Sequence, residues 1–563
     1  MRLVCAAALV AAVGCSKSPS DETLPPEPDP KGWTITVDMS GLDRFVQPGD
    51  STSWPVGGVA TATEGLATVK VNDALVDVDA SGAFVADVTV APGLTRVPIL
   101  ATDDAGHERK ADRTLLAAQF LADGDYNGSA AGLVLTDAIL GAMSESIAGY
   151  ASDVNIAAEI LSRDVLSQDD RCVTWPVQAR QGTVTAALVE DAGNLWLHIR
   201  VPNLYVYFEG SCQGLISQIP IAGQMGGTID VWTRLTAKPP VNGDACLSAF
   251  DHTRPQVSIT GWGFDVWGTS GPLQAWIVDL FAGNKSTEAR NQLTTEVGGR
   301  ADEMLGTKLA DVSVYEKTSE LDLLGRPLAL DLCVSGIEKT AQSTLVARIA
   351  ARATGAGMRE APGAPQLAGA VVRPAANELV LDGNLIGQLL FASWRDNGLT
   401  RTAPDIDAGI LQVLMPGLAK EFPDATTAQV WIEAELPPLV RVTPEAAADL
   451  SVELGDLMID VSIDGKRVLR FGAVLTLSLD LTPMNGALVP AVVDTKATVA
   501  LLDERHDGPD AALEQAVQVQ IGSAASKLLG DGAAIALPSL PGLGAPVAVT
   551  PDAGGRYLRI KLQ

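Results

Sequence analysis

Apolar residues recur at every third or fourth position in several stretches of the chain, a spacing that predicts amphipathic helices. The most regular stretch is residues 384–399, which end in the helix-stop signal Asn397-Gly398. Its main apolar positions share one helical face: Leu385, Leu389, Leu390 and Trp394. By itself this pattern fits an ordinary core helix as well as a helix with a binding role.

Further helices are predicted at residues 131–148, 286–309 and 407–422, and from Pro509 onward. A proline in the first turn suits the last of these. The apolar stripe of the helix at 131–148 includes Leu135, Ile139 and Met143. The stripe of the helix from Pro509 includes Leu513, Val517 and Ile521.

Alternation of apolar and polar residues predicts long strands between these helices. In the longest run, 468–481, every odd-numbered position from Leu469 to Leu481 is apolar, and Asp464-Gly465 before it supplies a hairpin turn. The order of helix, antiparallel strands, helix and strand occurs twice.

A connector rich in Gly and Pro, residues 351–375, separates the two occurrences. We therefore expect a mainly β fold with long helices (α+β), in which residues 119–350 and 376–563 form two pseudo-repeated barrels. Each barrel would be a curved antiparallel sheet wrapped on a long helix.

Residues 33–118 precede these units and carry short alternating runs with turn signals every eight to twelve residues or so, which is typical of a β-sandwich. The runs Thr68-Val-Lys-Val-Asn, Ser81-Gly-Ala-Phe and Ala101-Thr-Asp-Asp-Ala-Gly resemble bacterial immunoglobulin-like repeats. The resemblance implies a spacer or an adhesive module.

The first residues have the pattern of an export signal. Arg2 precedes an apolar run that is too short to span a bilayer, and Ala12-Val13-Gly14-Cys15 resembles the lipobox of bacterial lipoproteins. We expect residues 1–14 to be a signal peptide, Cys15 to be lipidated, and residues 15–32, rich in Pro, Ser and acidic residues, to be a flexible tether. The expected location is the bacterial outer membrane, on its periplasmic or cell-surface face. The alternative is an ordinary signal peptide that is cut nearby.

Four cysteines then remain for an oxidising compartment: Cys172, Cys212, Cys246 and Cys333. They allow three pairings, of which we favour Cys172–Cys212 and Cys246–Cys333 because the first two bracket one run of strands. No Cys-x-x-Cys spacing indicates a metal or redox site.

The charge of the chain excludes some partners. The formal net charge is −28, from 40 Lys and Arg against 68 Asp and Glu. Such a chain repels nucleic acid and anionic lipid headgroups at long range, so we expect no nucleic-acid partner and no neutralisation of lipopolysaccharide.

One stretch offers cation ligands. Asp123, Asp125 and Asn127 lie at alternate positions beside glycines, like the first half of a calcium loop, but Val134 stands where a bidentate Glu should close it. A polar turn that caps the next helix is the simpler interpretation, and we expect neither a metal nor a cofactor.

The order of elements in residues 125–563 resembles the tubular lipid-binding superfamily, in its two-barrel branch of bactericidal/permeability-increasing and lipopolysaccharide-binding proteins. Residues 384–399, the helix that follows at 404–422, and the ending Ile535-Ala-Leu-Pro carry the resemblance. It implies apolar grooves that hold acyl chains, and a cysteine pair in the first barrel that Cys172–Cys212 would suit. The acidic charge departs from the basic tips of the antibacterial relatives.

We therefore expect a lipid-anchored envelope protein that binds phospholipid or another acyl lipid. In one form of this hypothesis the protein also transfers the lipid. An unidentified envelope protein is a further expected partner. The groove candidates are Leu135, Ile139, Met143, Leu385, Leu389, Leu390, Trp394, Leu513, Val517 and Ile521. The alternative is an adhesive or scaffolding lipoprotein without bound lipid. The common catalytic signatures His-Glu-x-x-His, Gly-x-Ser-x-Gly and Gly-x-Gly-x-x-Gly do not occur, so we expect no enzyme.

Overall fold

The computed structural model describes most of the chain from Trp33 onward. The described residues are 33–39, 44–47, 53–141, 143–144, 155–162, 164, 166–168, 172–213, 218–240, 244–247, 249–267, 286–309, 316–444, 448–484, 486–530, 535–536 and 544–563. The expected signal peptide, Cys15 and the tether lie outside these residues.

The first folded unit consists of two sheets that pack on one core. One sheet has the order β1 (Ile35–Asp38), β3 (Ser53–Ala62) and β6 (Ala83–Thr89). The other has the order β2 (Phe45–Val46), β8 (Glu108–Ala117), β7 (Gly93–Asp103), β4 (Leu66–Val71) and β5 (Ala74–Val76). Val56 and Phe84 from the first sheet and Val97 and Leu115 from the second are buried in the same cluster, so this unit is a β-sandwich.

A seven-stranded antiparallel sheet, the central sheet, lies in the middle of the molecule. Its order is β18 (Glu316–Leu323), β19 (Arg326–Lys339), β20 (Leu345–Thr354), β10 (Asn127–Val134), β22 (Glu378–Asp382), β31 (Tyr557–Leu562) and β30 (Pro546–Pro551). β10 pairs with β20 on one side and with β22 on the other. The central sheet therefore combines strands from both expected barrel ranges.

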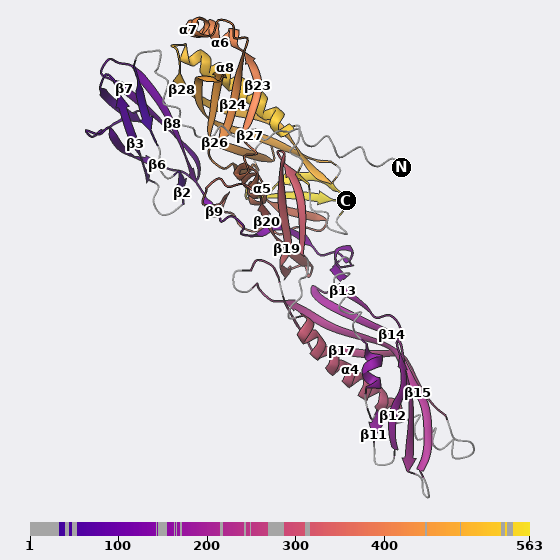
Figure 1. Cartoon of the computed structure of the whole chain (residues 1–563). Helices are drawn as coiled ribbons and strands as arrows, with labels where there is room; N and C mark the ends of the chain where they lie inside the picture. Colours follow the sequence, from indigo (N-terminus) through magenta and orange to yellow (C-terminus); the bar gives the residue numbers. More distant parts are fainter. Residues whose placement is uncertain are drawn as a thin grey trace, which may run out of the picture.

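Two strongly curled antiparallel sheets, the half-barrels, flank the central sheet (Figure 1). The first contains β11 (Ser167–Gln168), β12 (Cys172–Arg180), β13 (Thr185–Asp191), β14 (Asn194–Gln213), β15 (Gln218–Ala237), β16 (Phe250–His252) and β17 (Gln256–Trp267). The second contains β23 (Arg401–Asp407), β24 (Thr427–Ala434), β25 (Leu439–Val442), β26 (Leu450–Ile463), β27 (Lys466–Met484), β28 (Ala487–Glu504) and β29 (Ile535–Ala536). The expected mainly β fold with curled antiparallel sheets is confirmed at this level.

Helices cover these sheets and fill the junction between them. They are α2 (Ile156–Leu161), α4 (Ser286–Lys308), α5 (Gly383–Arg395), α6 (Ala408–Leu414), α7 (Pro416–Glu421) and α8 (Asp510–Gly530). A short pair, β9 (Gln119–Leu121) and β21 (Ala364–Gln366), completes the connections.

Two expected helices differ from the structure. Residues up to Val134 belong to β10, and the described helical residues of the predicted 131–148 helix are 137–141 and 143–144. A short apolar run fits a strand as well as a helix. The predicted helix 407–422 is divided into α6 and α7 at Met415, because Pro416 disfavours a helical conformation in the residue before it.

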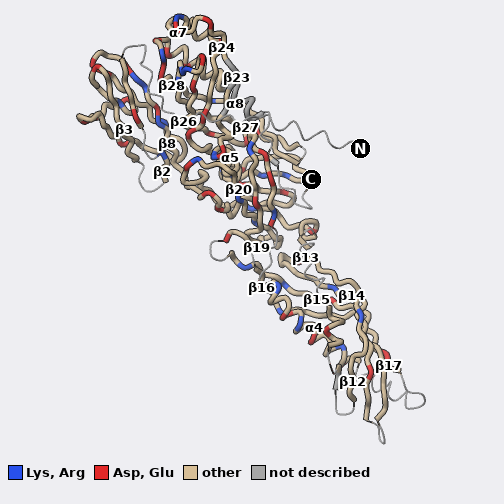
Figure 2. The backbone as a smooth tube through the Cα atoms, in the orientation of Figure 1, with Lys and Arg blue, Asp and Glu red and all other residues tan. Residues whose placement is uncertain are grey.

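The sandwich packs against the second half-barrel through its strand β8 (Figures 1 and 2). An apolar cluster joins Leu116 and Ala118 to Leu436 and Leu439. Around it, oppositely charged residues pair across the interface: Arg44 with Glu435, Arg109 with Asp503, and Lys110 with Asp510 and Glu514. Side-chain contacts, in addition to the covalent connection of the polypeptide, therefore hold the sandwich to this half-barrel.

Candidate lipid-holding half-barrels

The first half-barrel presents a continuous apolar face. Its long strands β14 and β15 alternate between buried apolar and more exposed residues along 20 positions each. The buried side chains that share the apolar cluster are Leu188, Leu195, Leu197, Ile199, Val201, Leu204, Val206, Phe208, Met225, Ile229, Val231, Leu235 and Ile259. Alternation of this kind lines one face of a sheet with hydrocarbon over its full length.

Irregular pairing and glycine let this sheet curl. The register shifts between Val201 and Leu204, and again between Gly226 and Thr228. A Cβ at Gly226 would lie 1.9 Å from the carbonyl oxygen of Leu204, so only glycine fits there. Bulges and glycines of this kind bend a strand and increase its twist.

Helix α4 covers the first half-barrel along β17 (Figure 1). Only four of its 23 residues are buried: Leu293, Val297, Ala301 and Leu305. Polar bonds fasten it at the rim, where Trp262 Nε1 donates to Ser286 Oγ at 2.9 Å and Arg290 Nη2 donates to the Ile259 carbonyl at 2.9 Å. The sequence predicts this helix at residues 286–309, but none of its four buried residues is among the site candidates.

The second half-barrel has the same construction. The odd-numbered residues of β27 from Leu469 to Leu481 are all buried, as the alternation predicts. Helix α8 lies along β28, where Gln518 Nε2 donates to the Ala497 carbonyl at 2.8 Å and Glu514 accepts the Leu501 amide at 2.9 Å. Among the site candidates on α8, Leu513 and Ile521 are buried and Val517 is partly buried.

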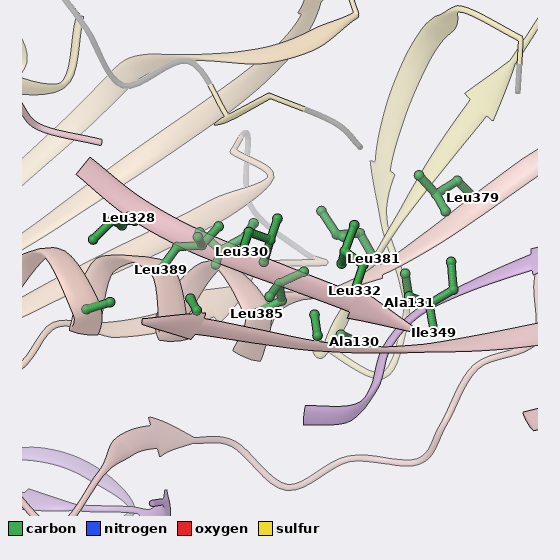
Figure 3. Close-up of a cluster of buried hydrophobic side chains, with 14 of the residues drawn as sticks. Ala130, Ala131, Leu328, Leu330, Leu332, Ile349, Leu379, Leu381, Leu385 and Leu389 are labelled. Atoms are coloured by element: carbon green, nitrogen blue, oxygen red, sulfur yellow. The ribbon is translucent and has the colours of Figure 1, made fainter. Parts of the chain in front are cut away.

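Helix α5, the predicted 384–399 helix, lies at the junction and not on a rim. Every residue except Arg395 is buried, including Leu385, Leu389, Leu390 and Trp394. Figure 3 shows Leu385 and Leu389 pointing toward side chains of the central sheet such as Leu330 and Leu381. The indole Nε1 of Trp394 donates to the Ala434 carbonyl at 2.8 Å.

The remaining candidates lie between the first half-barrel and the central sheet. Leu135 and Met143 are buried, and Ile139 is partly buried in the same cluster. Ser144 connects this segment to β13, since its Oγ accepts the Leu188 amide at 2.7 Å. The ten groove candidates thus occupy three separate places in the molecule, and their role in lipid contact stays a prediction.

Two of the three candidate calcium side chains, those of Asp123 and Asn127, have other partners, whereas Asp125 is bound through its backbone carbonyl. Asp123 forms an ion pair with Arg395. The Asp125 carbonyl accepts from Gln388 Nε2 at 3.0 Å, and Asn127 Nδ2 donates to Asp382 at 3.2 Å. Within the part of the chain that the structure describes, no three His, Cys, Asp or Glu side chains gather as metal ligands.

Both disulfides have the favoured pairing. Cys172 bonds to Cys212 across β12 and β14, and Cys246 bonds to Cys333 on β19. The second bond attaches the segment before β16 to the central sheet. Two disulfides are typical of a protein that folds outside the reducing cytosol. Among the described residues no helix is both long and apolar enough to cross a membrane.

Comparisons with known proteins give structural likeness only. No family model and no curated protein matches the sequence. The fold is similar to a crystal structure of lipopolysaccharide binding protein, with a TM-score of 0.34 and 13% identity over 79% of this chain and 99% of that chain. It is also similar to the structure of P47 from Clostridium botulinum A2, with a TM-score of 0.25 and 10% identity over 77% of this chain and 97% of that chain.

Proposed function

We propose that this protein holds acyl lipids against the apolar faces of its two half-barrels. The observation that carries the proposal is the contrast between α4 and α5. Helix α5 buries all of its 13 residues but one, whereas α4 buries four of 23 and covers a much larger apolar sheet. A helix with so narrow a stripe loses little apolar contact when it moves away from the sheet.

The energy of such binding comes from the acyl chain. Each methylene that leaves water contributes about 0.8 kcal/mol, so a long chain contributes on the order of 10 kcal/mol before the cost of moving α4. No catalytic group is needed for this function. The net charge of −28 favours a neutral or zwitterionic headgroup over an anionic one.

Mass spectrometry of the native protein tests the proposal directly. Protein stripped of lipid is incubated with phosphatidylethanolamine vesicles, or with phosphatidylglycerol vesicles as the anionic comparison, and is then isolated by gel filtration. We expect one or two phosphatidylethanolamine molecules per chain and less phosphatidylglycerol. Protein that emerges without lipid from both incubations would favour a scaffolding or adhesive role.

A reversible crosslink tests the route of entry. The Cβ of a residue at position 298 would lie 3.5 Å from Val257 Cγ2, so the two positions are in contact across α4 and β17. The variant used is therefore the double cysteine Gly298→Cys and Val257→Cys, oxidised to a disulfide. The oxidised double variant should lose loading of the first half-barrel, and each single variant should load normally. Unchanged loading of the crosslinked protein would show that α4 is not the entrance.

The location belongs to the same proposal. We propose that Cys15 carries a lipid anchor and that residues 15–32 link it to the folded units, at the outer membrane. The two disulfides are consistent with an exported protein. Metabolic labelling with palmitate should label the wild type but not Cys15→Ser, and equal labelling of both would exclude an anchor at Cys15.

A further inference from the structure

A cavity of about 240 Å³ lies on the central sheet, beneath the connector between the two halves of the chain. We call it the connector cavity. Its floor comes from β10, β19, β20 and β31, and its roof is the segment 371–374. A water molecule occupies about 30 Å³ in the liquid, so the space admits a small organic molecule.

The strand register places the polar groups of this cavity on one face of the sheet. Arg348 pairs with Gly132, and Gly132 pairs with Val380. Tyr557 pairs with Asp382, two residues beyond Val380 and therefore on the same side. Leu379 and Leu381 point to the other side of the sheet, which α5 covers. Gly132 leaves the floor open because it has no side chain.

Two hydrogen-bond donors of the connector cavity lack a partner. Tyr557 is 2% exposed, and its hydroxyl finds no hydrogen-bond partner among the described residues. The Nε of Arg348 is likewise buried and unpaired within the described part of the chain. Burial raises the pKa of Tyr557 to about 12, so its hydroxyl keeps its proton and can donate. Buried donors without an acceptor are costly, which favours an oxygen-bearing occupant.

The charges define the occupant more closely. Glu338 forms an ion pair with Arg348, and Arg373 on the roof is exposed, with no ion pair in the described residues. Glu338, Arg348 and Arg373 together carry one net positive charge. This charge suits a monovalent anion better than a divalent phosphate. Val346, Val371, Val372 and Pro374 supply apolar walls.

We propose that the connector cavity binds a small organic acid, a monocarboxylate on a short apolar chain. The two carboxylate oxygens accept from Tyr557 Oη and Arg348 Nε, and the chain packs against the valines of the roof. This site is separate from the half-barrels and does not depend on their lipid loading.

Isothermal titration calorimetry of the purified full chain with sodium hexanoate tests the assignment. We expect saturable binding of hexanoate and none of 1-hexanol, which lacks the carboxylate. Tyr557→Phe should raise the Kd about tenfold or more, because it removes one hydrogen bond to a charged group. It should keep or raise the Tm, because the hydroxyl it removes has no partner in the described part of the chain.

A second variant keeps the test independent of folding. A Cβ at position 132 would lie 3.5 Å from Pro374 Cδ, an ordinary contact, so Gly132→Ala should fold and fill part of the cavity. It should weaken hexanoate binding severalfold. The control is Tyr126→Phe. Tyr126 lies outside the cavity, and Arg352 Cζ lies 4.6 Å from its ring centroid. It should bind hexanoate as the wild type does.

Three results would overturn the proposal. They are no heat of binding with hexanoate, binding that Tyr557→Phe and Gly132→Ala leave unchanged, and binding of inorganic phosphate in place of hexanoate. The first would mean that water alone satisfies Tyr557 and Arg348. The second would place the acid elsewhere, and the third would contradict the apolar half of the site.

Discussion

The guanidinium of Arg556 donates from Nη2 to Oδ2 of Asp382 at 2.7 Å, and the Asp382 side chain is completely buried. Asp382 also begins α5, since its Oδ1 accepts the Asn384 amide at 3.0 Å. Its Oδ2 accepts from Asn127 Nδ2 of β10 at 3.2 Å. One carboxylate therefore joins the first half of the chain, the central helix and the C-terminal strand.

Removal of the cation from this group should be costly. We predict that Arg556→Met lowers the free energy of unfolding by about 3–5 kcal/mol, because it leaves a buried carboxylate without its counter-charge. Urea denaturation measures the loss. The double variant Asp382→Asn, Arg556→Met should lose less than the sum of the two single changes.

An exposed arginine provides the comparison. Arg467 lies 3.1 Å from Asp503 and its side chain is 43% exposed. Arg467→Met should cost less than about 1 kcal/mol. Equal losses for Arg467→Met and Arg556→Met would contradict the structural role of Asp382.

The contact between the sandwich and the second half-barrel should depend on pH through Asp456. Its Oδ1 accepts the Thr114 amide at 2.9 Å, and Arg44 lies 3.4 Å from Oδ2. Burial raises the pKa of Asp456 from 3.8 to about 6, although Arg44 opposes the shift. The stability that comes from this protonation is therefore fully present below pH 3.8 and is lost as the pH rises through about 6.

The difference between a pKa of 3.8 and one of about 6 corresponds to roughly 3 kcal/mol. We predict that Asp456→Asn removes this decline between pH 4 and pH 7, while it keeps an oxygen for the Thr114 amide. Unfolding free energies at several pH values measure it. The same slope in Asp456→Asn and wild type would assign the pH dependence to other groups.

Glu421 at the end of α7 should act in the opposite direction. It accepts from Arg505 Nη2 at 2.7 Å and from His506 Nε2 at 2.9 Å. The hydrogen bond with Arg505 lowers its pKa from 4.5 to about 2, with a further contribution from His506. Its stabilising contribution is present above pH 4.5 and is lost as the pH falls through about 2.

We predict that Glu421→Gln destabilises the second half-barrel at pH 7 and has little effect below pH 2. Acid titration followed by circular dichroism measures the difference. Asp424→Asn, a change at an exposed neighbour, is the matched control, and its acid unfolding midpoint should equal that of the wild type. An acid midpoint in Glu421→Gln that equals that of the wild type would show that this cluster contributes nothing.

Local patterns predicted the elements whose neighbours are close in the sequence. The stripe of α4, the helix α5 and the alternation of β27 all match the structure, because each depends on the period of one element. Pro416, which divides the predicted 407–422 helix, was visible in the sequence and indicates the break.

The central sheet could not be predicted in this way. β10 pairs with β20 and β22, more than 200 residues later, and β22 pairs with β31 near the C-terminus. Periodicity says which face of a strand is apolar but not which strand is its neighbour. For the same reason the apolar stripe of α5 indicated burial but could not distinguish a junction between sheets from the wall of a groove.

The difference between α5 and α4 can be measured with two matched leucine substitutions. Leu389 on α5 is 5% exposed and Leu293 on α4 is 6% exposed, so burial of the single side chain is the same. We predict that Leu389→Ala lowers the global free energy of unfolding by about 2–5 kcal/mol, because the closed junction cannot relax around the lost volume. Leu293→Ala should instead increase native-state hydrogen exchange mainly within α4, because a helix with four buried residues opens locally. It should also speed the uptake of phosphatidylethanolamine, whereas Leu389→Ala should not. Faster exchange throughout the protein in Leu293→Ala would mean that α4 is part of the core and that lipid enters by another route.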